Sequence, residues 1–147
     1  MEQEPVEKVV NGRKILLVVE GKMIRDLLVT TLKLAGAKSI VFGSPVEMMR
    51  QVKDYAPELI FCEYDMPGVN GADFVMQLRN TCKLTTPTVV LVSQHDSDGQ
   101  ARSRTAGANE ILLMPFSVQD LLRTSKRMLA LDAQRPPTQL RFGPRRS

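Results

Sequence analysis

The sequence predicts an α/β fold built on one open, doubly wound parallel sheet. Five short apolar runs alternate with amphipathic stretches between residues 13 and 131, and this alternation is typical of strand–helix units with right-handed crossovers. The runs are continuous and aliphatic, which indicates strands covered on both faces. The chain has 147 residues, of which 43% are hydrophobic and 24% charged. These values suit a single globular domain with a full core.

The five apolar runs define the predicted strands. They are KILLVV at 14–19, KSIVF at 38–42, ELIFC at 58–62, TVVLVS at 88–93 and EILLM at 110–114. In such a sheet the functional residues gather beyond the carboxyl ends of the strands. We therefore expect Val19 with Glu20, Glu63, Ser93 and Met114 to surround one crevice.

The stretches between the strands predict five helices. Apolar spacing favours helices over 23–34 and 72–79, while the helix predicted over 97–106 has the weakest pattern because it is polar. Ser44 to Glu47 combines a capping box with proline at the first helical position. A second cap, Ser117 to Asp120, begins the final helix, which the paired prolines further on cannot continue.

The ends of the chain differ from its middle. The first twelve residues are polar and acidic, unlike an export signal, and no run could span a membrane. We predict a disordered lead-in over 1–12, a domain over 13–131 and an arginine-rich arm over 132–147, in a cytoplasmic protein. Cys62 and Cys82 are then expected to be free thiols. No metal site is expected at His95, the single histidine, because no second ligand is near it in the sequence.

The net charge of +4 conceals an asymmetry. From Arg123 to the C-terminus the chain has seven Lys and Arg against one acidic residue, so these residues carry +6 and the first 122 carry −2. A tail of this kind usually meets an anionic partner.

Several motifs resemble one family in their order and spacing. The stretches ILLVVE, DMPGVNG, VVLVS, AGANE and MPF resemble the receiver domain of bacterial two-component response regulators, of the single-domain CheY-like kind. The resemblance covers residues 13–131. It implies a flavodoxin-like (βα)5 sheet in strand order 2-1-3-4-5.

The resemblance also implies a phosphotransfer site, from which this sequence departs. Receivers use an acidic pair for Mg²⁺, an aspartate acceptor, a Ser or Thr, and a lysine that pairs with the phosphoryl group. Mg²⁺ needs oxygen ligands and the phosphoryl group needs cations. The matching residues here are Val19 with Glu20, Glu63, Ser93 and Met114, so three of the five positions are changed.

These changes predict a pseudo-receiver that is neither phosphorylated nor an enzyme. A further position, which often holds a switching aromatic in the family, holds Ile111. Glu63 carries one negative charge where a phosphate would carry roughly 1.5–2. It is therefore either a phosphate mimic or the product of drift, and the missing lysine and metal pair favour drift.

The arm offers groups that recognise guanine and phosphate. Arginine bonds bidentately to guanine edges or phosphate, a phenyl ring stacks on bases, and a carboxylate accepts from the guanine N–H edge. Cyclic di-GMP, with two guanines and two phosphates, would use all of these groups, and no other cofactor is expected. The candidate ligand residues are Arg127, Asp132, Arg135, Arg141, Phe142, Arg145 and Arg146.

A degenerate receiver followed by a basic arm is similar to the Cle proteins, the CheY-like c-di-GMP effectors. That resemblance implies a protein partner in the flagellar motor switch or the surface-attachment machinery. On the tail alone, a solvated disordered arm is the simpler interpretation.

Three other functions compete with the effector. The first is a ligand-independent adaptor whose tail is an electrostatic tether. The second is a phosphorylatable regulator, which the changed site argues against. The third is a nucleic-acid binder, whose four arm arginines would bind weakly and without sequence preference.

Overall fold

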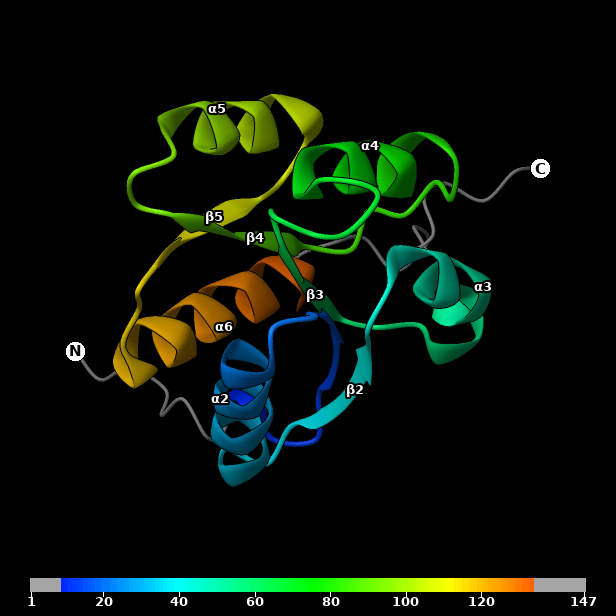
Figure 1. The fold of residues 1–147 in the computed structure, drawn as a ribbon. Coiled ribbons are helices and arrows are strands. Elements are labelled where there is room, and N and C mark those ends of the chain that lie inside the picture. The colour runs from blue at the N-terminus through cyan, green and yellow to red at the C-terminus, as the bar shows by residue number, and fades with distance from the viewer. Residues whose placement is uncertain (1–8, 134–147) are drawn as a thin grey trace.

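The computed structural model describes residues 9–133, which form one parallel sheet with helices on both faces (Figure 1). The sheet order is β2-β1-β3-β4-β5, which confirms the predicted fold class and order. The strands are β1 (Lys14–Val18), β2 (Lys38–Phe42), β3 (Leu59–Glu63), β4 (Thr88–Ser93) and β5 (Glu110–Met114). The helices are α2 (Lys22–Leu34), α3 (Pro45–Tyr55), α4 (Gly71–Asn80), α5 (Ser97–Ala106) and α6 (Val118–Ala133).

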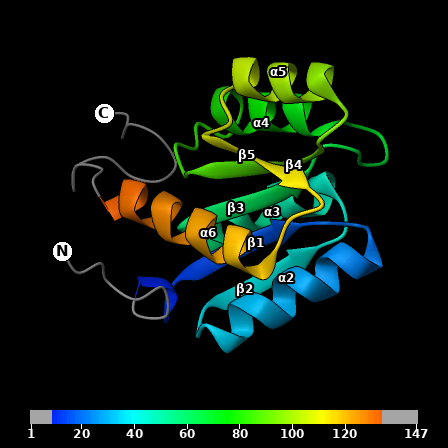
Figure 2. The ribbon, with the colours of Figure 1, turned by 90° about the vertical axis from the view of Figure 1, so that its left-hand side faces the viewer.

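Two apolar layers enclose the sheet. Helices α2 and α6 cover one face, and α3, α4 and α5 cover the other (Figure 2). Along β1, Leu16 and Val18 are buried in the layer beneath α3 and α4, whereas Ile15 and Leu17 are buried in the layer beneath α2 and α6. Both faces of the strand therefore need apolar side chains, which explains the uninterrupted aliphatic runs.

The two predicted helix caps are present. The Ser44 hydroxyl accepts a hydrogen bond from the Glu47 N–H at 3.3 Å at the start of α3. At the start of α6 the bonds are reciprocal, because the Ser117 hydroxyl accepts from the Asp120 N–H and the Asp120 carboxylate accepts from the Ser117 N–H. Each cap satisfies donors that the first helical turn leaves without partners.

The folded domain begins before residue 13. Val10, which we predicted to belong to the lead-in, is fully buried in the layer with Leu32 and Ala35. The Gly12 N–H donates to the Gly36 carbonyl at 2.8 Å. Residues 9–12 therefore pack against the end of α2 as part of the domain.

At the other end, α6 continues to Ala133 and includes the backbone of Asp132. The rest of the predicted arm lies outside the described residues. Between residues 9 and 133, no helix is both long and apolar enough to cross a membrane.

Candidate functional site

The carboxyl ends of the strands meet at one edge of the sheet, as the sequence predicted. In the strand registers, Val18 lies beside Cys62, Glu63 beside Leu91 and Ser93 beside Met114. Glu63 is the last residue of β3, and Val19 and Glu20 follow the end of β1. The sheet therefore brings the five receiver positions to one edge.

Glu63 does not point into an open crevice. Its Oε1 accepts hydrogen bonds from the backbone N–H groups of Glu20, at 2.7 Å, and Gly21, at 3.3 Å. These two residues form the loop between β1 and α2. Because β3 lies beside β1, the Glu63 carboxylate is next to this loop, and the extra methylene of glutamate, compared with aspartate, lets it reach the two N–H groups.

Gly21 is fitted to that carboxylate. A Cβ atom built at Gly21 would lie 3.3 Å from Oε2 of Glu63, closer than ordinary van der Waals contact. Gly21 is also the N-cap of α2, where it supplies no side-chain hydrogen bond, and the first turn of α2 has no acidic residue. Glu63 thus provides the negative charge that the positive end of a helix dipole favours.

The metal-binding position is not suited to Mg²⁺. Val19, which replaces one of the acidic pair, is fully buried in the apolar layer beneath α2 and α6. The Glu20 side chain is exposed, and Oε1 of Glu63 already accepts two hydrogen bonds. Within residues 9–133, no three His, Cys, Asp or Glu side chains are grouped closely enough to hold a metal ion. Since Mg²⁺ prefers several oxygen ligands in octahedral geometry, this donor set does not fit it.

The remaining receiver positions are occupied by local contacts. The Ser93 hydroxyl accepts a hydrogen bond from the His95 N–H at 3.1 Å. Met114, in the place of the lysine, packs its half-buried side chain against the layer beneath α2 and α6. Ile111, at the switch position, is buried beneath α4 and α5. This edge therefore offers an apolar thioether where receivers place a cation.

Two of the candidate ligand residues, Arg127 and Asp132, lie on α6, and the others lie beyond it in the sequence. Arg127, on α6, pairs with Glu110 at 3.1 Å between Nη2 and Oε1, and both side chains are partly exposed. A ligand could displace such a pair at little cost, because exposed ion pairs contribute about 0–1 kcal/mol. Asp132 is placed by its backbone alone, on the last turn of α6. The others lie outside the described residues: Arg135, Arg141, Phe142, Arg145 and Arg146.

Sequence reasoning missed the role of Gly21. A glycine N-cap is less common than Ser, Thr, Asp or Asn, so its position before α2 was one available signal. The other was the length of Glu63. Neither identifies the two backbone N–H groups that receive the carboxylate, because every non-proline residue has such a group.

Strand order 2-1-3-4-5, with Glu20, Glu63 and Ser93 near the carboxyl ends of the strands, is the arrangement of flavodoxin-like α/β domains, which include the receivers. In agreement, the family description "Response regulator receiver domain" matches residues 15–126. The chain belongs to this family, whose members act in signalling through protein partners.

Relatives of known sequence share the receiver region. Protein PilG of Pseudomonas aeruginosa is 27% identical over 122 residues, which cover 82% of this chain and 90% of PilG. The phosphate regulon transcriptional regulatory protein PhoB of the same organism is 24% identical over 119 residues, which cover 80% of this chain. The chain spans only 52% of PhoB, about half of that relative's length.

Solved structures share the fold. The chemotaxis response regulator CheY4 of Vibrio cholerae matches with a TM-score of 0.72 at 25% identity, covering 80% of this chain and 99% of CheY4. A CheY-like receiver domain protein of Methanospirillum hungatei matches with a TM-score of 0.76 over 84% of this chain and 98% of its own. At 17% identity, that second likeness concerns the fold alone.

Proposed function

We propose that this protein is a receiver-type effector that works without phosphotransfer. It binds cyclic di-GMP through its arginine-rich C-terminal arm and passes the signal to a protein partner. The observation that carries the first part is the Glu63 carboxylate, which is bonded to the Glu20 and Gly21 N–H groups rather than left open for a metal or phosphoryl group. Val19 and Met114 support it, because they replace a metal ligand and a cation with apolar side chains.

Phosphorylation chemistry can be tested directly. Beryllofluoride with Mg²⁺ mimics the phosphorylated state of an aspartate, and it should leave the amide NMR spectrum of the full chain unchanged. Shifts clustered around Glu63, Ser93 and Met114 would show that the site still assembles around a metal and would overturn this part of the proposal.

The second part rests on the arm and on the helix that leads into it. The charged residues Arg123, Lys126 and Arg127 lie on α6 within three turns of its end at Ala133. The arm adds four arginines, Asp132 and Phe142 to these cations. Arginine forks, a stacking ring and a carboxylate are the groups that a guanine dinucleotide requires.

Titration calorimetry of c-di-GMP tests this binding. We expect micromolar or tighter binding to the full chain, no comparable heat with GTP, and loss of binding when Arg135, Arg141, Arg145 and Arg146 are replaced by alanine. A chain ending at Ala133 is a second control, since it keeps every described helix. Equal binding by the arginine variant would show that the arm is not the sensor.

The partner proposed by resemblance is the flagellar motor switch or the surface-attachment machinery. The alternative is an adaptor that docks on a partner without a ligand, with its tail as an electrostatic tether. In that case the affinity of the adaptor for its protein partner would fall as the salt concentration rises, and would not change when c-di-GMP is added. The effector predicts instead that c-di-GMP changes partner affinity at constant salt.

A further inference from the structure

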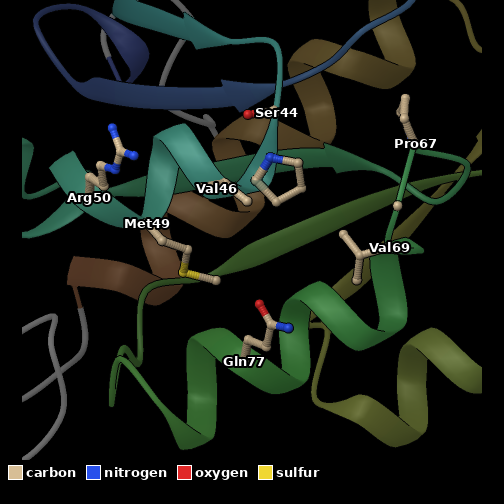
Figure 3. A pocket seen from close by; sticks show the side chains of 9 residues that line it. Ser44, Val46, Met49, Arg50, Pro67, Val69 and Gln77 are labelled. Carbon is tan, nitrogen blue, oxygen red and sulfur yellow. The ribbon is translucent and has the colours of Figure 1, made fainter.

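A groove lies between α3 and α4, on the side of the sheet away from α2 and α6 (Figure 3). Its volume is about 570 Å³. The apolar part of its lining comes from the start of α3, with Pro45, Val46 and Met49, and from the loop before α4, with Pro67 and Val69. Val46 is 67% exposed, so an apolar side chain is left open to solvent at this place.

The groove is the first of three connected depressions. The second, about 360 Å³ in volume, lies along α4 and shares Val69 and Gln77 with the first. The third, about 220 Å³, lies between α4 and α5 and shares Asp73 and Met76 with the second. A surface that continues from α3 across α4 to α5 is suited to a protein segment, because a small ligand would be enclosed by one pocket.

Charge is distributed unevenly over this surface. Arg50 is the one charged residue among those that line the groove, and Figure 3 shows it at the end opposite Pro67. Asp73 lies in the second and third depressions, further along α4. Neither Arg50 nor Asp73 forms an ion pair within residues 9–133. Arg102 lines the third depression and forms an exposed ion pair with Asp98, at 3.9 Å between Nη1 and Oδ2. From the groove to the second depression, the surface therefore presents a positive group, an apolar floor and a negative group in order.

We infer that the α3–α4 groove is a docking site for an amphipathic helix of a partner protein. The helix places apolar side chains against Met49 and Val69, a carboxylate against Arg50, and a basic side chain toward Asp73. Arginine and a carboxylate form a bidentate, charge-assisted pair that fixes orientation. The flexible thioethers of Met49 and Met76 adapt to the apolar side chains they meet. This surface begins in the segments that follow β2 and β3, but none of the five receiver positions lines it, and it does not depend on c-di-GMP binding.

The test uses a designed probe and the full chain labelled with ¹⁵N. The probe is an amphipathic helical peptide of about four turns, with leucines along one stripe, glutamates at one end of it and lysines at the other. Its addition should shift the amide signals of Val46, Met49, Val69 and Gln77 with a micromolar dissociation constant. Arg50→Glu should weaken binding roughly tenfold or more.

Three controls make the result specific. Arg25→Glu, on α2 across the sheet, should leave the affinity unchanged. A peptide with its glutamates changed to lysine should bind Arg50→Glu better than wild type. Val46→Glu should weaken binding while the protein stays folded, because an acid in the first turn of α3 suits the helix dipole.

The opposite results overturn the inference. They are the absence of amide shifts at millimolar peptide, amide shifts centred on other helices, or a peptide affinity that is the same for wild type and Arg50→Glu. Concentration-dependent shifts of the same amides without peptide would identify a second copy of this chain as the occupant, and would overturn the assignment to a partner protein.

Discussion

Replacing Glu63 with aspartate should destabilise this protein, although aspartate is the usual residue of the family at this position. Removal of one methylene withdraws the carboxylate by about 1.5 Å, the length of a C–C bond. The Glu20 N–H lies 2.7 Å from Oε1, so the separation would exceed hydrogen-bonding distance. The bond to the Gly21 N–H, already 3.3 Å long, would be lost as well.

The expected cost of Glu63→Asp is about 1–2 kcal/mol in the free energy of unfolding. A hydrogen bond to a charged group contributes about 1.5–3 kcal/mol. The Glu20 N–H is exposed, so water replaces the carboxylate there and the cost falls toward the lower end. For a domain of this size, the melting temperature should drop by roughly 3–10 °C.

Glu63→Gln is the matched control, because its side chain has the same length and keeps a carbonyl oxygen at the same place. It loses only the charge, so it should cost less than Glu63→Asp, about 0.5–1 kcal/mol. Amide hydrogen exchange gives the local result, since Glu20 and Gly21 should exchange faster in the aspartate variant than in the glutamine variant. A glutamine variant less stable than the aspartate variant would refute the reasoning, because charge and not reach would then be the important property of Glu63.

Three further predictions concern the rest of the domain. Arg79 donates hydrogen bonds to the carbonyls of residues 84, 86 and 107 and to the side-chain oxygen of residue 109. Arg79→Ala should therefore lower the free energy of unfolding, measured in urea, by about 2–4 kcal/mol, and Arg79→Lys should lower it less. Hydrogen bonds from Ser117 hold the pKa of Asp120 below its ordinary value. A carboxylate whose pKa is lowered by folding stabilises the folded state at pH values above its unfolded-state pKa. The difference in melting temperature between wild type and Asp120→Asn should therefore shrink as the pH falls below about 4. Burial raises the pKa of both cysteine thiols, and Cys62 is fully buried. A thiol reagent should therefore modify Cys82 in the folded protein, whereas Cys62 should react only as fast as the protein unfolds. Equal modification rates for the two cysteines would contradict this.

The strands and most helix ends could be predicted because their physical causes are local. Aliphatic runs, Ser44 and Ser117 are each visible within a few residues, and the structure confirms them. The polar stretch 97–106 also forms the predicted helix, α5, although its apolar pattern is weak. Its buried residues are the small Gly99, Ser103 and Ala106, and α5 packs against α4. Small side chains allow a close approach, so this helix does not need the large apolar stripe on which sequence patterns depend.

The site was predictable in its position but not in its contacts. The parallel topology places Val19, Glu63, Ser93 and Met114 at one edge, as observed. The partners of Glu63 are backbone N–H groups 42 and 43 residues away in sequence, and no side-chain pattern marks them. The α3–α4 groove depends in the same way on how two helices and a loop pack together, which short stretches of sequence do not record.

Glu63 can now be interpreted in a third way, besides phosphate mimicry and drift. A phosphate mimic needs a partner that responds to its charge, whereas drift requires no contact to the new side chain. Here the carboxylate bonds to the Glu20 and Gly21 N–H groups, and Gly21 lacks the Cβ that would crowd Oε2. The glutamate and the loop are matched, which supports a structural role: a negative side chain from β3 holds the start of α2.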